Sequence, residues 1–172
     1  MANNCYYEMH VSGERKAVHE FVRAMKWMGE YAEQGVGRVY SCDKFDIDDG
    51  QGDGYAIGLS GDCAWSILSA MRDDSNPNNI QKLSERLGLE IEAYSSEYGI
   101  GFEEHVYINK GDVEVNECVD AYEVCVDDID DETFNSDEFK KKGITKDNYM
   151  DYEEDGWIQV GGFDDWEFFF VD

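Results

Sequence analysis

Residues 89–126, LEIEAYSSEYGIGFEEHVYINKGDVEVNECVDAYEVCV, decide the fold of this chain. Apolar and polar residues alternate along three successive runs, and glycine-containing turns separate the runs at 99–101 and 110–112. Alternation with a period of two is typical of a strand with one buried face, and short glycine turns join antiparallel neighbours. The stretch therefore predicts an antiparallel meander.

Upstream of the meander, strand patterns and helix patterns alternate. Apolar residues recur at three- and four-residue steps in both helix patterns, and Gly88 is placed to end the second helix. The resulting order β-α-β-β-α-β is typical of the ferredoxin-like arrangement. We therefore expect an α+β fold with a ferredoxin-like core and extra antiparallel C-terminal strands. The expected elements are strands at 4–11, 36–41 and 55–59, and helices at 14–32, 64–71 and 79–87.

The segment after the meander is aromatic and strongly acidic. Residues 138–150 predict a weak helix, and residues 157–172 predict a strand pair that turns at Gly161-Gly162. Residues 112–172 hold 21 acidic and four basic side chains, against 19 and 10 in residues 1–111. This contrast predicts a core domain at 1–111 and an acidic C-terminal extension at 112–172, packed on the same domain.

The charge of the whole chain excludes several classes of partner. The 172 residues include 40 acidic and 14 basic side chains, a net charge of −26. Phosphate-rich partners need Lys and Arg, so we expect no direct nucleic-acid binding, and an anionic bilayer repels the chain. Without an apolar run of 18 residues or a secretory signal pattern, the expected location is the cytoplasm. High negative charge also raises solubility by itself.

The sequence contains no recognisable catalytic constellation. Phosphate-binding, nucleophile-elbow and HExxH motifs are absent, and five scattered cysteines with three histidines give no metal-site spacing. We therefore expect no enzymatic activity, no cofactor and no metal. Two alternatives stay open. His105, beside Glu103 and Glu104, is either a strand residue or a metal ligand. The loop 43–54 fails the EF-hand pattern at Ser60, but it offers cation ligands at Asp46, Asp48, Asp49 and Asp53.

Short motifs in the first 112 residues resemble a known family. The start of the chain carries Asn3-x-Cys5 and Met9-x-Val11-x-Gly13 before an amphipathic helix. Later motifs are Leu87-Gly88-Leu89, Tyr94, Glu97-Tyr98-Gly99-Ile100-Gly101-Phe102 and Tyr107. This pattern is similar to small phage- and plasmid-encoded proteins with a YubB-type ferredoxin-like domain. The resemblance implies a ferredoxin-like fold and an origin in a mobile element, and it implies no activity.

Acidic side chains interleave with aromatic ones after residue 111. Such a surface is complementary to an arginine-rich groove, through ion pairs and cation–π contacts. A net charge of −26 on a domain about 40 Å across also approaches the charge of duplex DNA of similar length. The residues expected to contact the partner are Asp112, Glu114, Glu117, Asp120, Glu123, Asp127, Asp128, Asp130, Asp131, Glu132, Asp151, Tyr152, Glu153, Glu154 and Asp155.

The leading hypothesis is therefore a non-enzymatic acidic inhibitor from a phage or other mobile element. It would mimic nucleic acid and block the basic groove of a host defence protein of the CRISPR or restriction type. A second hypothesis is a protein-binding module that uses exposed C-terminal aromatic residues, with charge serving only solubility. A third is an enzyme or metal protein built on the acidic loop.

Overall fold

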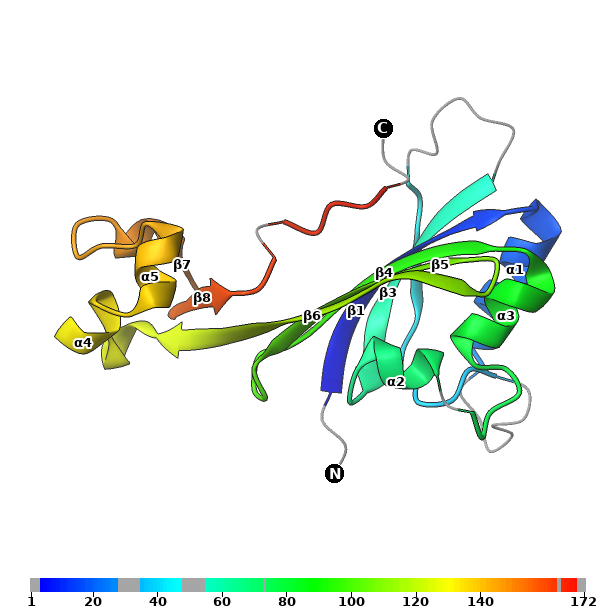
Figure 1. The fold of residues 1–172 in the computed structure, drawn as a ribbon, viewed down its shortest axis with the longest axis horizontal. Coiled ribbons are helices and arrows are strands. Elements are labelled where there is room, and N and C mark those ends of the chain that lie inside the picture. Colours follow the sequence, from blue (N-terminus) through cyan, green and yellow to red (C-terminus); the bar gives the residue numbers. More distant parts are fainter. Residues whose placement is uncertain (1–3, 28–34, 48–54, 73, 164, 170–172) are drawn as a thin grey trace.

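The computed structural model describes residues 4–27, 35–47, 55–72, 74–163 and 165–169. The chain is an α+β protein with one antiparallel eight-stranded sheet, in the order β2-β3-β1-β4-β5-β6-β8-β7 (Figure 1). The strands are β1 (Asn4–Gly13), β2 (Asp43–Phe45), β3 (Tyr55–Ala64), β4 (Glu90–Glu97), β5 (Phe102–Asn109), β6 (Asp112–Cys125), β7 (Glu153–Glu154) and β8 (Trp157–Gly161).

The helices of the described chain are short. They are α1 (Arg15–Met25), α2 (Ile67–Met71), α3 (Ile80–Leu87), α4 (Asp131–Phe134) and α5 (Asp137–Lys142), with 3₁₀ turns η1 (Val126–Asp128) and η2 (Tyr149–Tyr152). The predicted meander is confirmed as β4-β5-β6, and Gly88 ends α3 in a left-handed conformation with φ of 65°.

One face of the sheet packs against α1, α2 and α3. Alternate residues of β1, among them Tyr7 and Met9, are fully buried there with Phe21 of α1 and Leu83 of α3. Ser66 and Asn79 accept backbone hydrogen bonds at the N-termini of α2 and α3, which fixes where these helices begin. This face holds the main hydrophobic core.

The opposite face of the sheet is covered by the end of the chain. We call this segment, Phe163 and residues 165–169, the C-terminal strap. The ring of Trp166 stacks on Tyr6 of β1, with ring centres 6.1 Å apart, and Phe168 stacks on His10 at 3.7 Å. Phe169 meets Tyr107 of β5 edge to face. The strap thus lies over β1, β4 and β5.

β6 extends beyond the main lobe and carries a second small core. Its residues 112–120 pair with β5, whereas residues 121–125 pair with β8. Residues 121–161, here the C-terminal lobe, enclose buried Phe139, Ile144, Ile158 and Val160. Figure 1 shows this lobe at the far end of β6, away from α1–α3. The total accessible surface is 10008 Å², above the value of about 8600 Å² for a compact chain of this mass.

Three sequence-based predictions of elements need correction. Residues 36–41 contain only a single bridge, Val39 to Cys63, because the edge strand forms later at β2. The predicted C-terminal strand pair is wrong, because only β8 is a strand and the described residues beyond it form the strap. The predicted helix 138–150 is replaced by α5 and η2, since Gly143 ends α5 in a left-handed conformation. Within 14–32, α1 ends at Met25, and residues 28–34 lie outside the described chain.

The two cores predict separable effects of core mutations. Phe139→Ala should cost about 3–5 kcal/mol of the stability of its cluster, because a fully buried aromatic ring leaves a cavity. Amide hydrogen exchange should then accelerate in α5 and β8 and stay slow in β1 and β4. Phe134→Ala, which removes a half-buried ring beside the same cluster, is the matched milder change. Equal acceleration in β1 and β4 would show that the two cores unfold as one.

Candidate protein-binding surface

The predicted contact residues lie almost entirely on the surface. Fourteen of the fifteen are exposed, and Glu153 is half-buried because its carboxylate accepts a hydrogen bond from the Gly156 amide at 2.5 Å. They lie on β6, η1, α4, η2 and β7, with Asp130 at the N-cap of α4 and Asp155 directly after β7. The surface therefore runs along β6 and continues over the C-terminal lobe.

The acids of β6 do not form one row. Glu117 lies opposite His105 of β5, on the face that the strap covers, whereas Asp120 lies opposite Phe102, which packs against the main core. Directly opposite residues of an antiparallel pair project to the same face, so these two acids point to opposite faces. A bulge at Glu114 shifts the alternation again. Charge along β6 is therefore divided between both faces.

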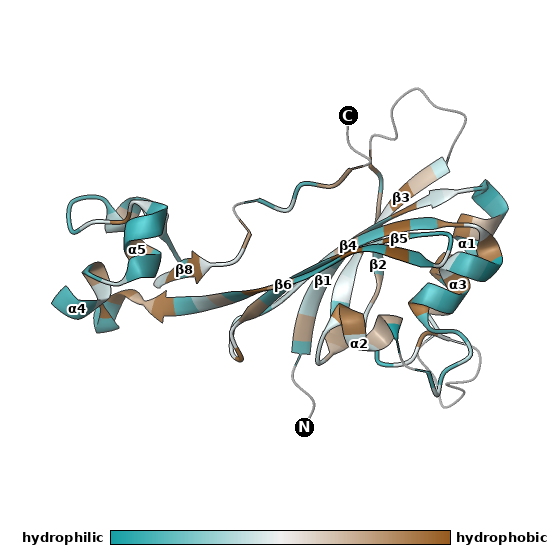
Figure 2. Cartoon of the chain, viewed as in Figure 1, coloured by the Kyte–Doolittle hydropathy of each residue, from teal (hydrophilic) through white to brown (hydrophobic). Residues whose placement is uncertain are grey.

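The C-terminal lobe gathers the remaining acids more densely. Of its 13 acidic side chains, 12 are exposed, and it holds only four basic ones. Phe134 and Tyr149 meet edge to face with centres 5.5 Å apart, which joins α4 to η2. The two predicted acidic segments, 112–132 and 147–155, are therefore brought together by the second core. In Figure 2, α5 and part of α4 are coloured as hydrophilic, whereas β8 is coloured as largely hydrophobic.

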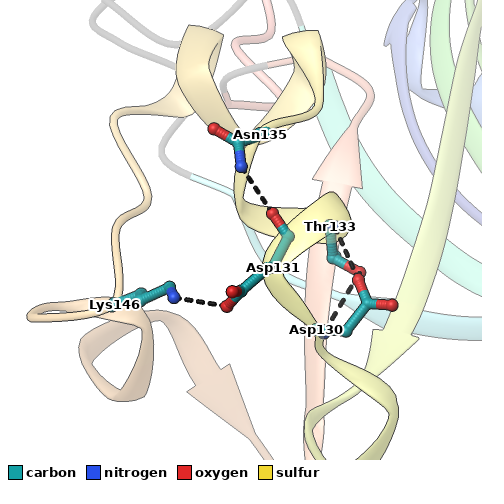
Figure 3. A network of polar contacts seen from close by, with 5 residues as sticks. All are labelled: Asp130, Asp131, Thr133, Asn135 and Lys146. Atoms are coloured by element: carbon teal, nitrogen blue, oxygen red, sulfur yellow. Dashed lines mark hydrogen bonds and ion pairs between the residues drawn. The ribbon is translucent and has the colours of Figure 1, made fainter.

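A polar network fixes the acidic helix α4 (Figure 3). The Asp130 carboxylate accepts hydrogen bonds from the Thr133 amide at 2.8 Å and its hydroxyl at 2.9 Å. These bonds lower the pKa of Asp130. Asp131 forms an ion pair with Lys146, and its carbonyl accepts a bond from the Asn135 side chain at 2.6 Å. Asp130 and Asp131 thus have structural partners, whereas no described side chain forms an ion pair with Asp127 or Asp128.

Large apolar side chains are also exposed on the C-terminal lobe. Met150 is 53% exposed, Trp157 is 46% exposed and Tyr152 is 43% exposed. They flank Glu153 and Glu154 in the η2-β7-β8 hairpin. Tyr149, by contrast, packs against the second core. The acidic surface therefore includes an aromatic element, as the sequence predicts for Tyr152.

Two buried carboxylates under the strap were not predicted from the sequence. Glu103 of β5, 1% exposed, accepts hydrogen bonds from the Phe163 amide at 2.7 Å, Gln159 at 2.8 Å, Tyr98 at 2.8 Å and the Trp166 indole at 3.4 Å. Burying a carboxylate is costly unless hydrogen bonds replace its water. Burial and the bond to Glu103 raise the pKa of Tyr98. Glu103 therefore anchors the start of the strap.

Glu92 of β4 anchors the other end of the strap. Its side chain is fully buried and accepts bonds from the Phe169 amide at 2.6 Å and from His105 Nε2 at 2.8 Å. The His105 ring stacks on Tyr94, whose hydroxyl donates to the Glu167 carbonyl at 2.9 Å. The expectation that His105 is a strand residue is confirmed, and its partner is Glu92.

His10 completes the covered face without a polar partner. It is 5% exposed, stacks on Phe168, and its Nδ1 atom has no hydrogen-bond partner. Burial lowers the pKa of His10 to about 4. The imidazole therefore stays neutral in the folded chain at neutral pH.

The remaining candidate groups are metal ligands and thiols. No cluster of three or more metal-ligating side chains forms there, while Asp48, Asp49 and Asp53 of the acidic loop lie outside them. Cys5, Cys42 and Cys63 are buried free thiols, and Cys118 is exposed. Within the same residues, no helix is long and apolar enough to cross a bilayer.

Comparisons with protein-family models, curated proteins and solved structures found no significant match.

The hydrogen bonds of Glu103 predict that mutations of two neighbouring residues change proteolysis of the strap to different extents. Glu103→Ala removes the acceptor of four hydrogen bonds, so chymotrypsin should cleave the aromatic strap faster than in the unmodified protein. Glu104→Ala is the matched control, because Glu104 is the next residue, is also buried, and binds Ser95 and the α2 amide of Leu68 on the opposite face. Equal cleavage in both variants would contradict a role of Glu103 in holding the strap.

The buried His10 predicts a specific loss of stability in acid. The unfolded chain binds a proton at His10 near pH 6.5, whereas the folded chain does so only near pH 4. The stabilisation is therefore complete above about pH 6.5 and is lost as the pH falls toward 4. Between pH 7 and 4.5, the free energy of unfolding should fall further in the unmodified protein than in His10→Phe.

His19→Phe, at an exposed position on α1, serves as the control for that comparison. It should follow the pH dependence of the unmodified protein. If His10→Phe does so as well, His10 is not held neutral by burial.

Proposed function

We propose that this chain is a non-enzymatic acidic inhibitor that occupies the basic, nucleic-acid-binding groove of another protein. The observation that carries the proposal is the C-terminal lobe, where 12 exposed carboxylates surround a core of four fully buried residues. A fixed framework supports mimicry better than a disordered acidic tail, because less ordering entropy is lost on binding.

Two of the predicted contact residues have structural roles in α4, which narrows the set of acids that are free to contact a partner. Asp130 and Asp131 hold the helix in place, whereas exposed acids such as Asp127, Asp128, Asp151 and Glu154 form no ion pair within the described chain. Such charges meet arginine and lysine in a groove shaped for phosphate, where charge-assisted hydrogen bonds are strong. The acids along β6 continue the negative charge over about 35–40 Å from this surface, divided between the two faces of the strand.

The fold and origin form part of the same proposal. The order β4-β1-β3-β2 is antiparallel throughout, so β1 and β2 run parallel with β3 between them. This order is compatible with the split β-α-β arrangement of a ferredoxin-like core, and it supports both that core and the resemblance to YubB-type proteins of phages and plasmids as parts of the proposal. A host defence protein of the CRISPR or restriction type, met in the host cytoplasm, is the partner that such an origin favours.

A second candidate function rests on the exposed apolar side chains. Met150, Tyr152 and Trp157 lie within one hairpin, and aromatic residues of this kind dominate many protein interfaces. In that case the contact is apolar and the surrounding acids serve solubility. The two candidates differ in the effect of salt, because screening weakens contacts between exposed charges and not apolar ones.

The test is capture from a bacterial lysate on the immobilised full chain. We expect nucleic-acid-binding proteins to bind at about 0.1 M salt, and to elute at about 0.5 M salt or with competing duplex DNA. The substitutions Asp127→Lys, Asp128→Lys, Asp151→Lys and Glu154→Lys should together abolish capture. Capture that survives both salt and DNA, and is lost in Trp157→Ala, would favour the apolar module.

The control carries the same change in net charge elsewhere. Reversal of four exposed acids of the main lobe should leave capture largely intact, which separates surface position from total charge. These are Glu14, Asp43, Asp74 and Glu85. Loss of capture in both variants would mean that net charge alone drives the association.

A further inference from the structure

β6 has an open edge before Asp120. On one side, residues 112–120 pair with β5, while β8 occupies the other side only from Ala121 onward. Among the described strands, none pairs with β6 on that second side before Ala121. The side chains of Asn116, Glu117 and Cys118 are exposed there. An unpaired strand edge is a template for another strand.

The hydrogen bonds at the end of this edge show which backbone groups are open. The Gly162 amide donates to the Asp120 carbonyl at 2.8 Å, and the Ala121 amide donates to Gly101 beside β5 at 3.1 Å. Backbone groups of successive strand residues point to alternate sides. The backbone N–H and C=O groups of Val119 and Glu117 therefore point to β5. Those of Cys118 and Asn116 point to the open side.

The chain itself leaves this edge at a defined place. Gly161 and Gly162 both have positive φ, of 74° and 77°, and a Cβ on Gly161 would lie 2.4 Å from the Asp120 carbonyl oxygen. Only glycine allows so close a turn. β8 therefore ends there and the strap crosses the sheet face, so no strand of the described residues continues the line of β8 beside residues 113–119.

Charge selects the kind of strand that fits the open edge. Asp112, Glu114, Glu117 and Asp120 are exposed along the edge. A second copy of this chain would place acids against acids, and like charges on neighbouring strands are destabilising. An extended segment rich in lysine or arginine would instead form ion pairs and a backbone ladder together. The acidic stretch of the edge ends at Asp120, where Lys141 and Lys142 line a cavity of about 350 Å³ together with Asp120 and Glu138.

We propose that the open edge of β6 binds a basic, extended segment of the partner protein by strand addition. The inference rests on the proposed function for the basic character of the partner, and it adds how the partner is held. Backbone hydrogen bonds at Asn116 and Cys118 provide affinity, and the flanking acids provide selection for positive charge.

Hydrogen exchange with a defined peptide tests the proposal on the unmodified protein. The probe is an eight-residue peptide of alternating lysine and valine. Its binding should slow exchange of the Asn116 and Cys118 amides by about tenfold or more. The Glu117 and Val119 amides already face β5 and should change little. The control peptide has the same sequence with N-methyl groups on alternate residues, which keeps the charge and removes the ladder.

Protection that alternates along β6, with the unmethylated peptide alone, would support strand addition. Equal binding of the two peptides, protection confined to residues 127–155, or no binding would overturn it. Cys118→Pro removes only an amide that faces the open side, so it should abolish alternating protection, whereas Cys118→Ser should retain it. If lysate capture remains sensitive to salt and DNA but the peptide does not bind to β6, strand addition is wrong. The proposal that the acidic surface binds a basic groove is then unaffected.

Discussion

β6 changes partners halfway along its length, and the position of everything after residue 120 depends on this change. Its first part completes the main sheet beside β5, and its second part is the base on which β8 and the second core are built. The five-residue β8 and the two-residue β7 would be too short to persist without that base. A single long strand thus holds the acidic lobe away from the main core while backbone hydrogen bonds keep it in register.

The strap covers the face of the sheet that the helices leave open. With α1, α2 and α3 on one face, the other face of β1, β4 and β5 presents aromatic rings that need cover. The strap supplies rings, and Glu92 and Glu103 accept the backbone and indole N–H groups that would otherwise be buried without acceptors. Since these carboxylates also need donors to replace water, each side of the contact satisfies the other. The strap therefore has a defined position despite lacking regular secondary structure.

Local sequence patterns were sufficient to predict helices with one apolar stripe and strands in which apolar and polar residues alternate. The spacing of Val18, Phe21 and Met25 predicts α1, and Gly88 correctly marks the end of α3. The exposed acids of the C-terminal lobe were also identified from sequence. The strap and its anchors were not, because an acid at Glu92 or Glu103 has the same pattern whether water or a distant segment covers it. That choice is made by contacts across about 60 to 77 residues, which periodicity does not encode.

The acidic character of β6 has two physical consequences that act together. Negative charge along an open edge keeps identical chains from pairing there, as edge strands of many proteins require. The same charge does not oppose a basic strand, so the protection is selective and not general. A lysine-rich edge would repel copies of itself equally well, yet it would fit a nucleic acid and not a nucleic-acid-binding groove. The sign of the charge is therefore the informative feature. Either sign opposes the pairing of identical edges, whereas only the negative sign would make the edge and the neighbouring lobe complementary to the basic partner that we propose.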